Sequence, residues 1–121
     1  MEGNSSLDNE NEIIYILDDL KKWNNLFTID HEYYFDGWAI FMTEKNLYPR
    51  YIVIFKSYKE KTFTIKSYEV YFSELYTKKY KELIQIDKIS NIKDLLREIK
   101  EIIYGKDFHN YAKKIIVNKI K

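Results

Sequence analysis

The stretch PRYIVIFKSYKEKTFTIKSYEVYF, residues 49–72, decides the fold that this sequence predicts. Its residues 51–55 (YIVIF) are all apolar or aromatic, and such side chains suit the pleated surface of a strand better than a helix. Successive side chains on a strand point to opposite faces, so Ile52 and Ile54 share one face, and the other face carries Tyr51, Val53 and Phe55. Because both faces are apolar, we expect this strand in the middle of a sheet that is covered on both sides.

The second half of the stretch predicts a turn and a further strand. Residues 59–61 (KEK) are too charged to be buried, and residues 62–66 (TFTIK) alternate polar and apolar side chains, as in a strand with one wet face. The alternation changes phase at Ser67, after which the in-facing set is Tyr68, Val70 and Phe72. A change of phase indicates a bulge or a new strand, and we favour the new strand.

The residues before this stretch predict a helix. Residues 1–7 are small and polar, and we expect them to be disordered. A helix begins near Asp8 or Asn9, either of which can cap it, and ends at residues 24–25. Its buried stripe follows helical spacing and consists of Ile13, Ile16, Leu17, Leu20 and Trp23.

A first strand is predicted between this helix and the central strand. Residues 28–35 are ambiguous, although their aromatic side chains suggest β-structure, and Asp36-Gly37 indicates a turn. Residues 38–43 (WAIFMT) then predict a strand, and residues 44–48 a loop.

The C-terminal part predicts helices. Ser73 can cap a short helix through Leu83, although residues 83–86 would also suit an edge strand. The strongest helical pattern covers residues 91–104, capped by Ser90 or Asn91 and stopped by Gly105. Asp107 can cap a final helix with a basic end.

The predicted fold is therefore α+β: an N-terminal helix, an antiparallel meander of three to four strands, and two to three C-terminal helices packed on the sheet. Residues 8–121 are expected to form a single domain.

Composition excludes several classes of protein. The chain has no cysteine, which excludes disulfide scaffolds, iron–sulfur clusters and cysteine nucleophiles. It contains no apolar run near the ~20 residues that cross a bilayer, and its acidic N-terminus does not resemble a signal peptide. We therefore expect a soluble protein in the cytoplasm or elsewhere inside the cell. The abundance of Ile, Lys, Tyr and Asn suggests an AT-rich genome as its source.

Charge is unevenly distributed although the net charge is +1. Residues 1–48 contain 3 basic and 10 acidic residues, whereas residues 49–121 contain 17 basic and 9 acidic residues. This asymmetry suggests an acidic or nucleic-acid partner for the second half. We favour a plainer interpretation, in which the acidic first half packs against the basic second half.

No motif indicates catalysis. The three glycines are isolated, so no phosphate-binding loop is expected. The best metal candidate is Asp30-His31-Glu32 with Asp36 nearby, but neighbouring residues on a strand point in opposite directions, and a polar turn explains them more simply. Glu98 and Lys100 have the spacing of a nuclease site, but they lie in the predicted helix of residues 91–104. We expect no catalytic residue, no metal and no cofactor.

A binding surface has more support. A sheet face with aromatic and lysine side chains can stack bases and neutralise phosphates. The residues predicted to form such a face are Tyr58, Lys59, Lys61, Lys66, Tyr68, Tyr71, Lys78 and Lys79, with Lys81 continuing it. The alternative is that half of these tyrosines are core and that the lysines keep an edge strand soluble.

We therefore expect a non-enzymatic protein that binds a macromolecule, with another protein as the first choice of partner. Inhibitors, immunity proteins and host-interaction factors of AT-rich viruses, bacteria or mobile elements are the classes that fit. The alternative function is single-stranded nucleic-acid binding. A homodimer is left open, and a membrane partner is not expected, because the basic C-terminal stretch KKIIVNKIK lacks a lipid anchor.

Overall fold

The structure, a computed structural model, describes residues 5–45 and 50–106. These residues form one antiparallel sheet of five strands and two α-helices, which confirms the α+β class. The helical elements are α1 (Ser5–Leu20), the 3₁₀ turn η2 (Lys21–Trp23), α2 (Ile92–Glu101) and the π-helical segment η3 (Ile102–Lys106). The strands are β1 (Phe27–Tyr34), β2 (Gly37–Glu44), β3 (Arg50–Ser57), β4 (Phe63–Phe72) and β5 (Lys78–Ile89).

The sheet is a meander in which each strand pairs with its neighbour in sequence, in the order β1-β2-β3-β4-β5. The central position predicted for residues 51–55 is confirmed, because β3 is the middle strand. The strand count of three to four was too low, because the ambiguous residues 28–35 belong largely to β1 and because β5 was not expected at its full length.

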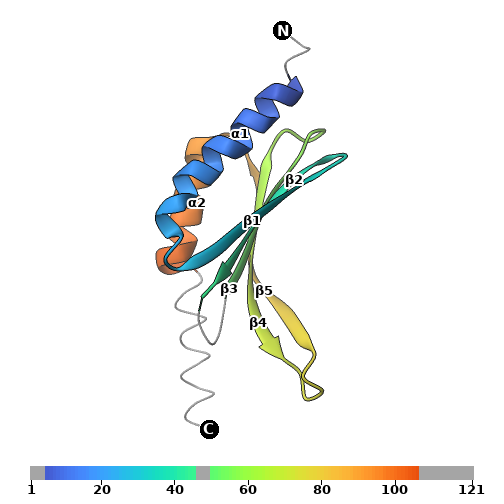
Figure 1. The fold of residues 1–121 in the computed structure, drawn as a ribbon, viewed down its shortest axis with the longest axis vertical. Coiled ribbons are helices and arrows are strands. Elements are labelled where there is room, and N and C mark those ends of the chain that lie inside the picture. Colours follow the sequence, from blue (N-terminus) through green and yellow to red (C-terminus); the bar gives the residue numbers. More distant parts are fainter. Residues whose placement is uncertain (1–4, 46–49, 107–121) are drawn as a thin grey trace.

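Both α-helices lie on the same side of the sheet (Figure 1). The core is the layer between them and the sheet. The helical elements contribute side chains such as Ile16, Leu20, Leu95 and Ile99, and the sheet contributes chiefly aliphatic side chains from its centre, including Ile40, Met42, Ile52, Ile54 and Ile65. The expectation that β3 is covered on both sides is wrong for the described residues, because no described element packs on the other face.

Strand β4 runs without a break through the predicted change of phase, so the prediction of a new strand at Ser67 is wrong. Ser67 and Glu69 are buried on the helix side, and the alternation places Tyr68, Val70 and Phe72 on the opposite face. The irregularity is instead a pair of register shifts between β4 and β5, one between Phe63 and Ile65 and one between Ser67 and Tyr68. The extra residues lie in β5, which is a bulged edge strand.

The short helix predicted from Ser73 to Leu83 is also wrong. Residues 73–77 form the turn of a hairpin, in which Ser73 and Thr77 are joined by a 2.9 Å backbone hydrogen bond, and Lys78 begins β5. Tyr80 lies opposite Val70 in the ladder. Pairing with the long strand β4 therefore overrides the weak helical spacing.

Helix α2 is capped as expected. The side chain of Asn91 accepts a 2.8 Å hydrogen bond from the Asp94 amide and donates one of 3.0 Å to the Asp94 carboxylate. Gly105 does not stop the helix in a left-handed conformation, because it continues in the π-helical segment η3 and its φ is not positive.

The remaining predictions lie partly or wholly beyond the described residues. Helix α1 begins at Ser5, earlier than the expected Asp8 or Asn9, so residues 5–7 are helical. Residues 1–4, residues 46–49 and the final helix predicted from Asp107 are not among the residues that the structure describes.

Candidate functional site

The open face of the sheet, meaning the face away from α1 and α2, carries a group of aromatic side chains. Strand alternation and the register place them on the side opposite the buried residues such as Ile40, Ile54 and Ile65. All five strands contribute: Tyr34 from β1, Phe41 from β2, Tyr51 and Phe55 from β3, Tyr68 from β4 and Tyr80 from β5. The spacing of neighbouring strands by ~4.8 Å brings these rings into contact range.

Tyr51 is the centre of this group. Its ring stacks on Phe41 with a centroid distance of 6.2 Å and an interplanar angle of 11°. It also meets the rings of Tyr68 at 5.9 Å and Tyr80 at 5.3 Å, and these two rings contact each other edge-on at 6.3 Å. Because these rings pack against one another, they form a preordered apolar surface with several hydroxyl groups.

Burial, and the neighbouring tyrosines and Glu32, raise the pKa of Tyr51 above its ordinary value of 10.0, burial being the largest cause. At the edge of the face, the Tyr34 hydroxyl donates a 2.7 Å hydrogen bond to Glu32, and this bond is the main reason that the pKa of Tyr34 is also raised. Both hydroxyls therefore remain protonated at neutral pH. The Tyr51 hydroxyl can donate a hydrogen bond to a partner, whereas the Tyr34 hydroxyl donates to Glu32 and can accept one from a partner.

The cations of the open face have neighbours of their own. The Nζ atom of Lys66 lies 3.9 Å from a carboxylate oxygen of Glu82 and 5.9 Å from the Phe55 ring centroid. Lys78 lies 5.7 Å from the ring centroid of Tyr80. Strand β1 adds the acidic residues Asp30 and Glu32 to this face. The face is thus aromatic with mixed charge, and not a continuous basic surface.

A shallow hollow of about 390 Å³ lies at the end of the open face near the β1–β2 turn. Its lining includes two small residues, Gly37 and Ala39, and the larger residues Tyr34, Phe41 and Phe55. Its volume is at the lower end of the range of ligand pockets, ~300–1,000 Å³. A hollow of this size with aromatic walls fits one large apolar side chain of a partner.

The structure does not bring the eight predicted binding residues together on one surface. Lys66, Tyr68 and Lys78 lie on the open face. Tyr58 packs instead against the core. The others lie elsewhere: Lys59 and Lys61 in the β3–β4 connection, and Tyr71 and Lys79 on the reverse face of the β4–β5 hairpin. Whether any of them contacts a partner stays a prediction.

The sequence did not predict five residues of the aromatic group as binding residues: Tyr34, Phe41, Tyr51, Phe55 and Tyr80. Tyr51 and Phe55 were assigned to a covered face, and Tyr80 to a helix. Residues 51–55 did carry one signal for an open face. One side of that strand is purely aliphatic, whereas the other side carries the two aromatic rings and the tyrosine hydroxyl. Aliphatic side chains favour the interior more strongly, whereas tyrosine is intermediate.

The metal candidate is separated in the way that strand geometry requires. Asp30 and Glu32 lie on the open face, paired with Phe41 and Ala39, whereas His31 lies on the opposite face and contacts the ring of Tyr33 edge-on at 5.6 Å. Within residues 5–45 and 50–106, no three His, Asp or Glu side chains gather in a way that would hold a metal ion.

Comparisons with known proteins give no relative: no family model, no curated protein and no solved structure matches this chain. Among the described residues, no helix has both the length and the apolar character needed to cross a membrane. We therefore infer function from the geometry of the chain itself.

Proposed function

We propose that this protein is a non-enzymatic binding protein whose partner is another protein, held on the open face of the sheet. The observation that carries this proposal is the group of six aromatic side chains on a sheet face that no described element covers. Tyrosine and phenylalanine are enriched at protein interfaces, because they combine a large apolar area with few flexible bonds.

The charges of the open face favour a protein over a nucleic acid. Binding to a nucleic-acid backbone requires lysines and arginines that are free to meet phosphates. On the open face, Lys66 forms an ion pair with Glu82. The carboxylates of Asp30 and Glu32 on the same face would repel a phosphate backbone. A mixed-charge rim around an aromatic centre is instead the usual composition of a protein interface.

The finer hypothesis is an inhibitor, immunity or host-interaction factor from an AT-rich virus, bacterium or mobile element. It rests on the composition and the small size of the chain. A location inside the cell also stays a prediction, which rests on the lack of cysteine.

The test is affinity capture from a lysate of AT-rich origin, with each sample divided into nuclease-treated and untreated halves. Three baits are compared: the wild type, Phe55→Ala on the open face, and Tyr15→Ala on the exposed side of α1. We expect one protein to be retained by the wild type and by Tyr15→Ala in both halves. Its affinity for Phe55→Ala should fall about 30-fold, as for the loss of a hot-spot residue.

Two results would contradict the proposal. If no protein distinguishes Phe55→Ala from the wild type, the open face is not the binding surface. If the captured material disappears with nuclease, the alternative function of single-stranded nucleic-acid binding takes its place.

A further inference from the structure

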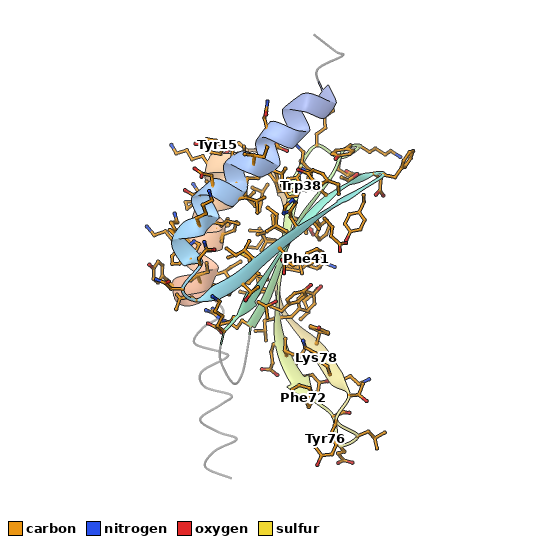
Figure 2. All side chains as sticks on the ribbon, viewed as in Figure 1. Tyr15, Trp38, Phe41, Phe72, Tyr76 and Lys78 are labelled. Atoms are coloured by element: carbon orange, nitrogen blue, oxygen red, sulfur yellow. The ribbon has the colours of Figure 1, made fainter. Side chains whose placement is uncertain are left out.

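The end of the β4–β5 hairpin exposes large apolar side chains. The hairpin projects beyond the part of the sheet that the helices cover (Figure 1), and Phe72 and Tyr76 lie along its outer end (Figure 2). Leu75 and Tyr76 are each 87% exposed, and Phe72 is 63% exposed. We call residues 72–77 the hairpin apex.

The apex has a defined turn. The Ser73 amide donates a 2.9 Å hydrogen bond to the Thr77 carbonyl, and the Tyr76 amide donates one of 2.9 Å to the Ser73 carbonyl. The Ser73 hydroxyl oxygen also accepts a 3.2 Å hydrogen bond from the Thr77 amide. Tyr76 has a φ of 60°, a left-handed conformation that costs a non-glycine residue ~1 kcal/mol or more. This turn therefore holds Leu75 and Tyr76 at the extreme end of the hairpin, at a cost in backbone strain.

Three lysines lie directly behind the apex on β5: Lys78, Lys79 and Lys81. A strand rises ~3.3 Å per residue, so Lys78 and Lys79 lie ~7–10 Å behind Tyr76. Apolar groups of peripheral proteins enter the boundary between headgroups and acyl chains by ~5–10 Å. If the apex entered a bilayer to this depth, the ammonium groups of Lys78 and Lys79 would lie at the level of the headgroups, where each cation is stabilised by anionic lipid.

We propose that the hairpin apex binds the surface of an anionic lipid bilayer, with Leu75 and Tyr76 inserted, with Phe72 beside Lys78 at the level of the headgroups, and with Lys78, Lys79 and Lys81 contacting the headgroups. Phe72 and Lys78 lie on the same side of β4 and β5 as the open face, so the two surfaces adjoin, but Leu75 and Tyr76 lie beyond that face in the hairpin turn. The proposal does not depend on the function proposed for the open face. A membrane partner was not expected from the sequence. Leu75 and Tyr76 were assigned to a short helix, and Phe72 to the in-facing side of a strand.

Charge distinguishes this apex from the other exposed hairpin end. Phe35, in the β1–β2 turn, is also fully exposed, but its neighbours include Glu32 and Asp36. An anionic bilayer would repel that turn. In the β4–β5 hairpin, Glu74 is the single acidic residue between Tyr71 and Lys81. Phe35→Ser is therefore a matched control for exposed apolar area without nearby lysines.

The test is co-sedimentation of the full chain with phosphatidylcholine vesicles, with and without phosphatidylserine. We expect binding only with phosphatidylserine, and weaker binding as salt rises. The double variant Leu75→Ser with Tyr76→Ser should bind at least ~10-fold more weakly. Replacing Lys78, Lys79 and Lys81 by Gln should weaken binding ~5-fold per lysine. Glu74→Gln should strengthen it, and Phe35→Ser should leave it unchanged.

All altered side chains are exposed, so thermal unfolding should match the wild type and show that each variant is folded. The proposal is overturned if the wild type does not sediment with phosphatidylserine vesicles at low salt, or if the apex variants bind as well as the wild type. It also fails if Phe35→Ser weakens vesicle binding as much as the apex variants do. A further contradicting result is that Leu75→Ser with Tyr76→Ser loses a protein partner while neither the wild type nor any variant binds vesicles.

Discussion

At the scale of single residues, Gly37 shows how closely β2 and β3 approach each other. A Cβ atom at this position would overlap the backbone carbonyl oxygen of Lys56. Gly37 is also buried and pairs with Ser57 at the end of the ladder. Any larger residue must therefore push the two strands apart.

We expect Gly37→Ala to lower the free energy of unfolding by ~1–3 kcal/mol, as for other overpacked sites. Urea denaturation followed by circular dichroism measures this change. Gly105→Ala is the control, because nothing lies within 4 Å of a Cβ there, and it should be neutral or slightly stabilising. Equal stabilities for the two variants would show that β2 and β3 do not approach as closely as the structure indicates.

Tyr51 gives the open face a pH dependence. Its pKa is raised in the folded chain, chiefly by burial, with further contributions from Tyr80 and other neighbours. A phenol with a raised pKa stabilises the fold at pH values below its unfolded pKa of ~10, and this contribution is lost as pH rises through the folded pKa. Stability should therefore fall above pH ~10.

Tyr51→Phe should reduce this alkaline loss, because phenylalanine does not ionise. Thermal unfolding of the wild type and the variant across the alkaline range measures the difference. The raised pKa of Tyr34 adds a similar alkaline loss of stability in the wild type and in Tyr51→Phe. Only the difference between the two proteins therefore reports on Tyr51. Parallel curves for the two chains would mean that Tyr51 is not shielded from solvent.

At the scale of elements, Arg50 joins the sheet to the end of the second helix. It is 2% exposed. Its guanidinium donates to both carboxylate oxygens of Glu44, at 3.3 and 3.0 Å, and to the carbonyl oxygens of Ile102 and Ile103, at 3.1 and 3.3 Å. Arg50 therefore fixes the start of η3, where α2 passes into the π-helical segment, on the sheet.

Arg50→Met should lower the free energy of unfolding by ~3–5 kcal/mol, because it removes the guanidinium from the largely buried carboxylate of Glu44, which keeps the Arg50 backbone amide. Arg97→Met is the control, since Arg97 pairs with Asp94 at 3.0 Å on the surface and should contribute less than ~1 kcal/mol. Chemical denaturation measures both values. Similar losses in the two variants would show that the Arg50 contacts are not structurally important.

The elements differ in how well the sequence predicted them. Helix α2 and strands β2 and β3 were predicted because their apolar spacing is strong and because local signals, such as the Asn91 cap, agree with it. Strand β5 was anticipated only in part, as the alternative edge strand over residues 83–86, since its outer residues are polar and are recognised as strand only through pairing with β4. The candidate site was missed because the sequence of a strand does not show which of its faces the other elements cover. The eight predicted binding residues were grouped by residue type alone. The alternation of side chains along the strands places several of them on different faces.

At the scale of the whole molecule, the two oppositely charged parts of the chain meet across the core. Lys56 of β3 forms a 2.8 Å ion pair with Glu12 of α1, and Arg50 pairs with Glu44 of β2. Each pair joins the acidic residues 1–48 to the basic residues 49–121. This supports the plainer interpretation of the charge asymmetry. Lys78, Lys79 and Lys81, by contrast, project with the β4–β5 hairpin away from the acidic helix.

The arrangement also separates Phe55, on the central strand of the open face, from the hairpin apex. Phe55 lies opposite Thr64 in the ladder, and Thr64 is eight residues from Phe72, which corresponds to ~26 Å of strand. Sites this far apart that share no partners have additive effects. Phe55→Ala should therefore weaken capture of a protein partner and leave vesicle binding unchanged, whereas Leu75→Ser with Tyr76→Ser should do the reverse. The variant with all three substitutions should show both losses, each as large as in the variant that shows it alone. A loss of vesicle binding in Phe55→Ala, measured in a folded chain, would mean that the open face and the hairpin apex form one surface.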